Sequence, residues 1–244
     1  MFKWDGSRVD LTDCKIEEAV QHDYWRIKFK NGQREVCLVK PSPHDAVPCL
    51  IDETKRLFNL EKVGTHWTIY NDKSYVLLRV KLNEEGSIIL DATLNTLNKY
   101  NQHIANEIKK IFAFREMMGV SKTNESSVIL RMEKYKGKEY VTPISFLEFK
   151  MEPAKEKIVI PKTVMDKWFI NVSYDENEKE VRKDLRTVDV ILDMLKIKKP
   201  EEISSVLFNL RYEFEKIVER VDRNNITFVD EVIERIGNYL QYGI

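Results

Sequence analysis

Hydrophobic residues recur at steps of three and four in residues 101–119, where Ile108, Ile111 and Phe112 mark one side of the segment. This spacing is typical of a helix with a wide apolar stripe. Gly119 is expected to end the helix, because glycine readily takes the positive φ of a helix C-cap. The patterns before this segment are strand-like and those after it are mostly helical. We therefore expect a central helix whose apolar side chains are buried.

The clearest strand pattern lies in residues 25–30, Trp-Arg-Ile-Lys-Phe-Lys, where apolar and basic residues alternate. This alternation has the period of a half-buried strand. Asn31-Gly32 follows, a pair that favours a two-residue hairpin turn in which both residues take positive φ. Residues 34–40 are predicted to form the return strand, which completes a hairpin.

Three prolines within residues 41–48 predict a loop, because proline donates no backbone hydrogen bond. Residues 50–58 then show the spacing of a short helix. A second hairpin is predicted from strands at 66–70 and 74–80, joined by the turn Asn71-Asp72. The first part of the chain is thus expected to be hairpin, helix, hairpin.

A third hairpin is predicted in the second half, from strands that flank Lys136-Gly137 within residues 128–146. A proline at a first helical position predicts a helix at 161–169. Three helices then close the chain, with apolar stripes at 181–195, 200–221 and 228–240.

The predicted fold class is α+β. An antiparallel, β-rich N-terminal lobe is expected over residues 1–90, and a mainly helical lobe over residues 91–244 with one hairpin near 128–146.

Charge and composition exclude some functional classes. The chain has 40 basic and 40 acidic residues, so its formal net charge is zero, which argues against a general polyanion binder. Arg26, Lys28 and Lys30 are expected on one face of the first hairpin, and a basic strand face can follow phosphates. The alternative is that these basic side chains simply face solvent, and the zero net charge favours it. The sequence therefore gives no strong indication of nucleic-acid binding.

The cysteines and histidines predict a reduced protein without a structural metal. Cys14, Cys37 and Cys49 are odd in number and form no Cys-x-x-Cys pair, and Cys37 lies in a predicted strand, where a buried hydrophobe is expected. No histidine lies at ligand spacing from a cysteine. With no apolar run long enough for a membrane span and no signal-peptide core, we expect an intracellular protein, cytoplasmic or nuclear.

Lys40 ends the return strand of the first predicted hairpin, and Glu53 lies in the helix that follows. In kinases a strand lysine supplies positive charge to nucleotide phosphates, and a glutamate on the next helix fixes its direction. In this order, and in the hinge-like run at 76–80, the chain resembles the small lobe of phosphoinositide-3-kinase-like and HipA-like kinases. The resemblance implies that Lys40 and Glu53 bind ATP with magnesium. The simpler alternative is a surface lysine and a helix carboxylate that never meet.

The order of helix, polar loop and strand in the second half is also similar to that of these kinases. The loop at 121–127 contains no aspartate, so the catalytic acid that the resemblance implies is absent, and Asn124 or Glu125 stands in its region. Ser145 or Glu148 stands where such kinases place a magnesium ligand. There is also no glycine-rich loop.

The resulting hypothesis is a catalytically degenerate kinase-fold relative that binds or assembles other macromolecules, with a protein as its partner. One alternative is an unrelated structural protein such as a virion component, since the sequence has a general resemblance to proteins encoded by large DNA viruses. The other is a divergent ATP-dependent phosphotransferase.

Overall fold

The computed structural model describes residues 3–18, 24–42, 46–79, 92–93, 102–119, 128–135, 138–145, 173–174, 181–182 and 187–242. The predicted helix at 161–169 lies outside these residues.

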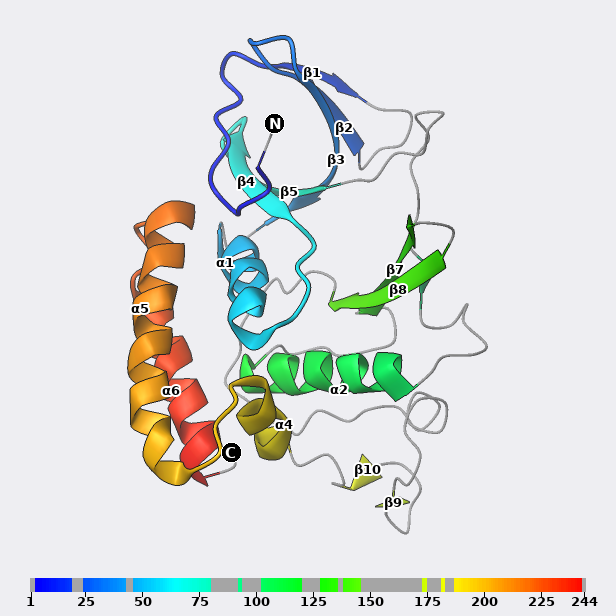
Figure 1. Cartoon of the computed structure of the whole chain (residues 1–244). Coiled ribbons are helices and arrows are strands. Elements are labelled where there is room, and N and C mark those ends of the chain that lie inside the picture. The colour runs from blue at the N-terminus through cyan, green and yellow to red at the C-terminus, as the bar shows by residue number, and fades with distance from the viewer. Residues whose placement is uncertain are drawn as a thin grey trace.

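One antiparallel sheet forms the N-terminal part of the molecule (Figure 1). Its strand order is β1-β2-β3-β5-β4, from β1 (Lys15–Glu18), β2 (Tyr24–Lys28), β3 (Arg34–Pro41), β4 (Thr65–Tyr70) and β5 (Lys73–Arg79). Both predicted hairpins are present, and β1 is an additional strand that pairs with β2.

The two hairpin turns differ from the prediction in one respect. Of the pair Asn31-Gly32, Gly32 alone has a positive φ, +82°, and its N–H donates to the carbonyl oxygen of Phe29 over 2.9 Å. The predicted two-residue turn is therefore wrong, because the connection is one residue longer and places its left-handed residue last. Asn71 and Asp72 do take positive φ, at 49° and 57°, as a two-residue turn requires.

Helix α1 (Val47–Thr54) follows the sheet's third strand and continues into a 3₁₀ turn, η1 (Lys55–Phe58). The helix begins inside the segment predicted as a loop, with Pro48 in its first turn. Proline is tolerated there because the first helical N–H groups have no intrahelical partner.

The other elements lie below the sheet in Figure 1. The helices are α2 (Gln102–Met117), α4 (Thr187–Met194), α5 (Ile203–Val221) and α6 (Thr227–Tyr242), with a 3₁₀ turn η4 (Pro200–Glu202) before α5. The strands are β6 (Ala92–Thr93), β7 (Val128–Tyr135), β8 (Lys138–Ser145), β9 (Ser173–Tyr174) and β10 (Val181–Arg182).

The central helix and the third hairpin are confirmed as α2 and β7–β8. Ile108, Ile111 and Phe112 are at most 4% exposed, and Gly119 takes positive φ after the helix. The helix predicted from residue 181 begins only at α4, because Val181 pairs with β9 as a strand.

Two hydrophobic clusters hold the fold together. The larger one joins the face of the sheet with Val76 and Leu78 to α1, α2, α4, α5 and α6, so it includes residues from both predicted lobes. The smaller one lies on the opposite face of the sheet, where Val9 and Leu11 cover Ile27. The division at residue 90 stays a prediction.

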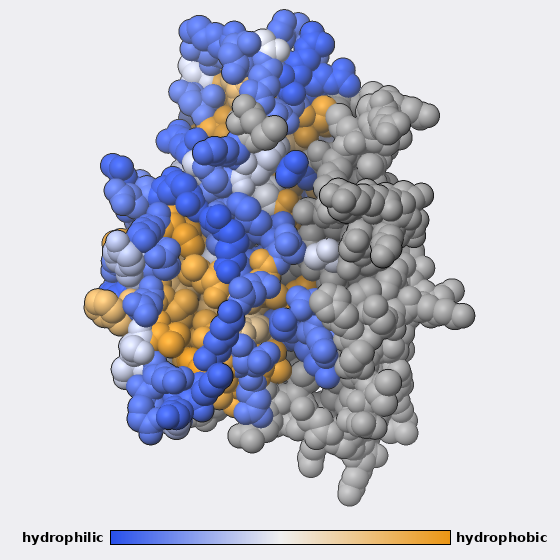
Figure 2. Space-filling view, viewed as in Figure 1, coloured by the Kyte–Doolittle hydropathy of each residue, from blue (hydrophilic) through white to orange (hydrophobic). Residues whose placement is uncertain are grey.

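Figure 2 shows hydrophobic residues gathered beside and between α5 and α6, while the sheet end of this view is mostly hydrophilic. None of the helices in the described part of the chain is long and apolar enough to cross a membrane.

Candidate functional site

Lys40 lies near the end of β3 and is half-buried. It is directly opposite Val76 of β5, which belongs to the larger hydrophobic cluster. Because opposite residues in a ladder project on the same face, Lys40 is on the α1 side of the sheet. The position of Lys40 in β3, on the face of the sheet that α1 covers, therefore matches the predicted position of a strand lysine beside the next helix.

Glu53 lies in α1, and its side chain is 0% exposed. Its carboxylate is shared by three cations, Arg56, Lys62 and Arg220, the last through an Nη2–Oε2 contact of 2.7 Å. Lys40 is not among its partners within the described part of the chain.

The predicted ion pair between Lys40 and Glu53 is therefore not formed in this structure. The carboxylate of Glu53 instead contacts Arg220 of α5, the helix that packs against α1. Figure 1 shows these two helices side by side. The role of both residues in nucleotide binding stays a prediction.

A buried carboxylate is costly unless it is paired, and here three cations offset the cost. Two of them also hold the N-terminal segment: Lys62 donates to the carbonyl oxygen of Trp4 over 2.6 Å, and Arg220 Nε donates to that of Asp5 over 3.1 Å. Glu53 thus joins α1, α5 and the first residues of the chain through shared partners.

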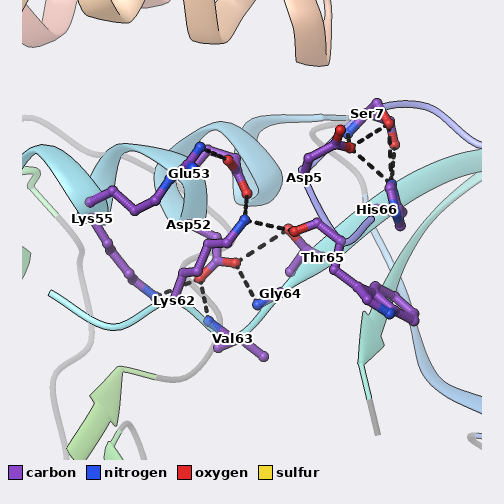
Figure 3. Close-up of polar contacts among 12 residues, drawn as sticks. Asp5, Ser7, Asp52, Glu53, Lys55, Lys62, Val63, Gly64, Thr65 and His66 are labelled. Carbon is purple, nitrogen blue, oxygen red and sulfur yellow. Dashed lines mark hydrogen bonds and ion pairs between the residues drawn. The ribbon is translucent and has the colours of Figure 1, made fainter. Parts of the chain in front are cut away.

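The neighbouring Asp52 is also buried, and it fastens α1 to the start of β4 (Figure 3). Its carboxylate accepts from the backbone N–H of Val63 at 2.9 Å and of Gly64 at 3.0 Å, and from Lys55 at 3.1 Å. The side chain of Lys55 is 0% exposed, so this pair lies in the interior. These contacts stabilise the fold, because they hold the carboxylate of Asp52 to η1 and to the segment before β4.

Asp5, Ser7 and His66 form a second polar cluster on the other side of β4 (Figure 3). Ser7 Oγ donates to Asp5 at 2.7 Å, and His66 Nδ1 lies 2.8 Å from the carbonyl oxygen of Ser7. Burial raises the pKa of Asp5, but hydrogen bonds from Ser7 outweigh it and lower the pKa below its ordinary value. The serine and aspartate both lie at Nδ1, whereas a nucleophilic triad uses opposite ring nitrogens. The cluster therefore does not activate Ser7.

Sequence reasoning did not single out Arg220, Lys62 or the cluster around His66. Nothing in the local pattern distinguishes Arg220 from the other basic residues of α5. Asp5 and Ser7 had a weak signal, since an aspartate two residues before a serine favours a local turn.

Asn124, Glu125 and Glu148 lie outside the described residues, and Ser145 ends β8. No group of metal-ligating side chains is found among the residues that the structure describes. The three cysteines are free thiols, and Cys37 and Cys49 are buried.

Comparison with solved structures gives the fold. The Helicobacter pylori proinflammatory kinase CtkA is similar over 96% of this chain and 96% of its own, with a TM-score of 0.50 and 14% sequence identity. The fold is kinase-like. At this identity the similarity concerns the fold alone.

Two structures of CtTel1 show weaker similarity. The complete CtTel1 dimer gives a TM-score of 0.43 at 10% identity, and the FAT and kinase domain gives 0.39 at 11% identity. Each covers 95% of this chain, which spans 11% and 21% of those two chains. No protein-family profile and no curated protein matches the sequence. CtkA is bacterial, so the similarity lends no support to a viral origin.

Proposed function

We propose that this protein is a kinase-fold relative that has lost phosphoryl transfer and works by binding another macromolecule. The kinase-like fold favours this reading over an unrelated structural or virion protein. The observation that carries it is the position of Glu53, whose carboxylate is engaged by Arg220 of α5 instead of orienting Lys40. In kinases the glutamate of this helix pairs with the strand lysine, and here that carboxylate binds other cations.

Two further features support the proposal. The loop at 121–127 contains no aspartate that could accept the proton of an acceptor hydroxyl. On α5, Phe208 and Tyr212 are 74% and 56% exposed, and they lie one helical turn apart. Neighbouring exposed aromatic residues are typical of surfaces that bind other macromolecules.

A phosphoryl-transfer assay tests the loss of catalysis. The protein is incubated with γ-labelled ATP and magnesium, alone and with generic protein substrates, and a thermal melt in millimolar ATP is recorded in parallel. We expect no transferred label. Any thermal shift that ATP causes should vanish in Lys40→Ala and persist in Lys73→Ala, which removes an exposed lysine at the start of β5. Label transfer that is lost in Lys40→Ala alone would instead establish a divergent phosphotransferase.

A further inference from the structure

The strand register places three cations in one row across the sheet. Lys15 of β1 is directly opposite Lys28 of β2, and Lys28 is directly opposite Arg34 of β3. All three side chains are exposed. Opposite residues project on the same face, and neighbouring strands are about 4.8 Å apart, so the row is about 10 Å long.

Arg26 extends this row along β2, two residues from Lys28 and on the same face. Glu17, opposite Arg26, is the one carboxylate that these three strands place on this face, and it pairs with Lys15 at 3.6 Å. Within the described part of the chain, no carboxylate lies within 4.0 Å of Arg26, Lys28 or Arg34.

We name this set, Lys15, Arg26, Lys28 and Arg34, the cationic face; with Glu17 it leaves three net positive charges. Like charges directly opposite each other destabilise a sheet. The exposed cations Arg211 and Lys216 of α5, and Arg223 just after it, are by contrast paired with acids. The chain as a whole is neutral, yet this face carries a local positive excess that an anionic partner would neutralise.

The other face of the same strands fixes this orientation. Ile27 is buried in the smaller hydrophobic cluster, so Arg26 and Lys28, on either side of it in β2, must project away from that cluster. β2 lies between β1 and β3, which occupy its backbone hydrogen-bonding groups. The cationic face therefore offers charge from side chains and no backbone cradle for a single phosphate.

We propose that the cationic face binds the sugar–phosphate backbone of a single-stranded nucleic acid. A regular array of cations matches repeated negative charges better than one isolated phosphate. Tyr24, half-buried and two residues from Arg26 on the same face, supplies an aromatic ring of the kind on which an unpaired base stacks. This inference rests on the proposed function, because it names the class of macromolecule that the kinase-fold relative binds.

Fluorescence anisotropy with a labelled oligothymidylate of about 16 nucleotides tests the proposal. The wild-type protein should bind with an affinity that falls as salt rises from about 50 mM to about 200 mM. The variant Arg26→Gln/Lys28→Gln/Arg34→Gln should bind at least about tenfold more weakly, and its slope of log K against log salt should be smaller by about 2, since each lost phosphate contact removes about 0.7. Its thermal melt should match or exceed that of the wild type, because repulsion is relieved.

The matched control is Arg211→Gln/Lys216→Gln/Arg223→Gln, in α5 and just after its end. It removes the same charge from exposed, acid-paired positions. It should retain the wild-type affinity and salt slope. Equal loss in both triple variants would overturn the proposal, because binding would then follow net charge and not the cationic face. Absence of binding by the wild type at about 50 mM salt would also overturn it.

Two competing polyanions test whether the cationic face prefers a nucleic acid to an acidic polypeptide or an anionic membrane. Polyglutamate and phosphatidylserine vesicles are added to the preformed complex at matched charge, and we expect neither to displace the oligonucleotide. Displacement by either would overturn the commitment to nucleic acid. Failure here would leave the phosphoryl-transfer assay unaffected, whereas transfer of label would overturn the proposed function whatever the oligonucleotide does.

Discussion

Trp67 of β4 donates its indole Nε1–H to the backbone carbonyl oxygen of Val221, the last residue of α5, over 2.9 Å. The indole is 6% exposed and Val221 is 2% exposed, so the bond lies in the interior. The last carbonyl groups of a helix have no intrahelical donor, and here a sheet residue supplies one. This contact and the Arg220–Glu53 pair, one residue earlier in α5, fix the end of α5 to the β-rich part of the molecule.

Trp67→Phe should lower the free energy of unfolding by about 1–3 kcal/mol, because the buried carbonyl of Val221 loses its donor. Urea denaturation measures the change. Trp25→Phe is the control, since the indole of Trp25 packs against Tyr70 and Tyr75 without donating a hydrogen bond within the described part of the chain. An equal loss in both variants would mean that ring size, and not the hydrogen bond, determines the effect.

Glu53→Gln should destabilise the protein by roughly 3 kcal/mol, the lower end of the range for breaking a buried ion pair, because its cations keep some access to water. Arg220→Gln should cost about 1 kcal/mol, since Arg56 and Lys62 remain paired with the carboxylate. The double variant should cost less than the sum, which chemical denaturation of all four proteins measures. Additive losses would show that Glu53 and Arg220 do not interact.

Gly32→Val should destabilise the fold by roughly 1 kcal/mol, because a β-branched residue resists the positive φ of +82°. Among the residues that the structure describes, no atom lies within 4 Å of the position that a Cβ would take, so the expected effect is backbone strain. Gly32→Asn is the matched comparison and should be nearly neutral, since asparagine tolerates this conformation. If the valine variant has the denaturation midpoint of the asparagine variant, strain at this turn is refuted.

Ile111→Ala in α2 should cost roughly 2–5 kcal/mol through lost burial and the cavity that remains, because Ile111 is 2% exposed. Lys110→Ala in the same turn should cost less than about 1 kcal/mol, since its pair with Glu107 is partly solvated. Both values come from the same denaturation series. Similar losses at the two positions would remove α2 from the core.

The stability of the protein should decline in alkali through Cys37. Burial raises the pKa of this thiol from 9.0 to about 12. The unfolded chain therefore ionises at lower pH than the folded one, so the stabilising contribution is complete below about pH 9 and decreases as pH rises towards 12. Cys37→Ala should flatten the fall in unfolding free energy between about pH 9 and about pH 12. If the slope of unfolding free energy against pH is unchanged in this variant, Cys37 is not the cause of the alkaline destabilisation.

Much of the fold could be predicted because its signals are local. The alternation around Ile27 and the spacing around Ile111 each report the face of one element. β1 was missed because Lys15–Glu18 contains one apolar residue, and its strand form depends on pairing with β2. Val181 fits a helical stripe as well as a strand, so its pairing with β9 decided the outcome.

The candidate site was less predictable because its geometry depends on distant contacts. The sequence placed Lys40 on a strand and Glu53 on the next helix correctly. The direction of Glu53 follows from the packing of α1 against α5, whose Arg220 is 167 positions away along the chain. No local pattern encodes such a distant contact. The cations opposite each other on β1, β2 and β3 likewise became apparent only from the register.

The attachment of α5 to the β-rich part has a consequence for synthesis on the ribosome. Residues up to Arg79 contain the whole five-stranded sheet and α1, but Arg220 and Val221 emerge about 140 residues later. At 5–20 residues per second this is a delay of about 7–28 seconds. During that interval the nascent sheet lacks the donor for Glu53 from α5 and the acceptor for Trp67. The five-stranded sheet is therefore translated well before it gains its contacts with α5, and its exposed apolar surface is a target for chaperones until α5 arrives.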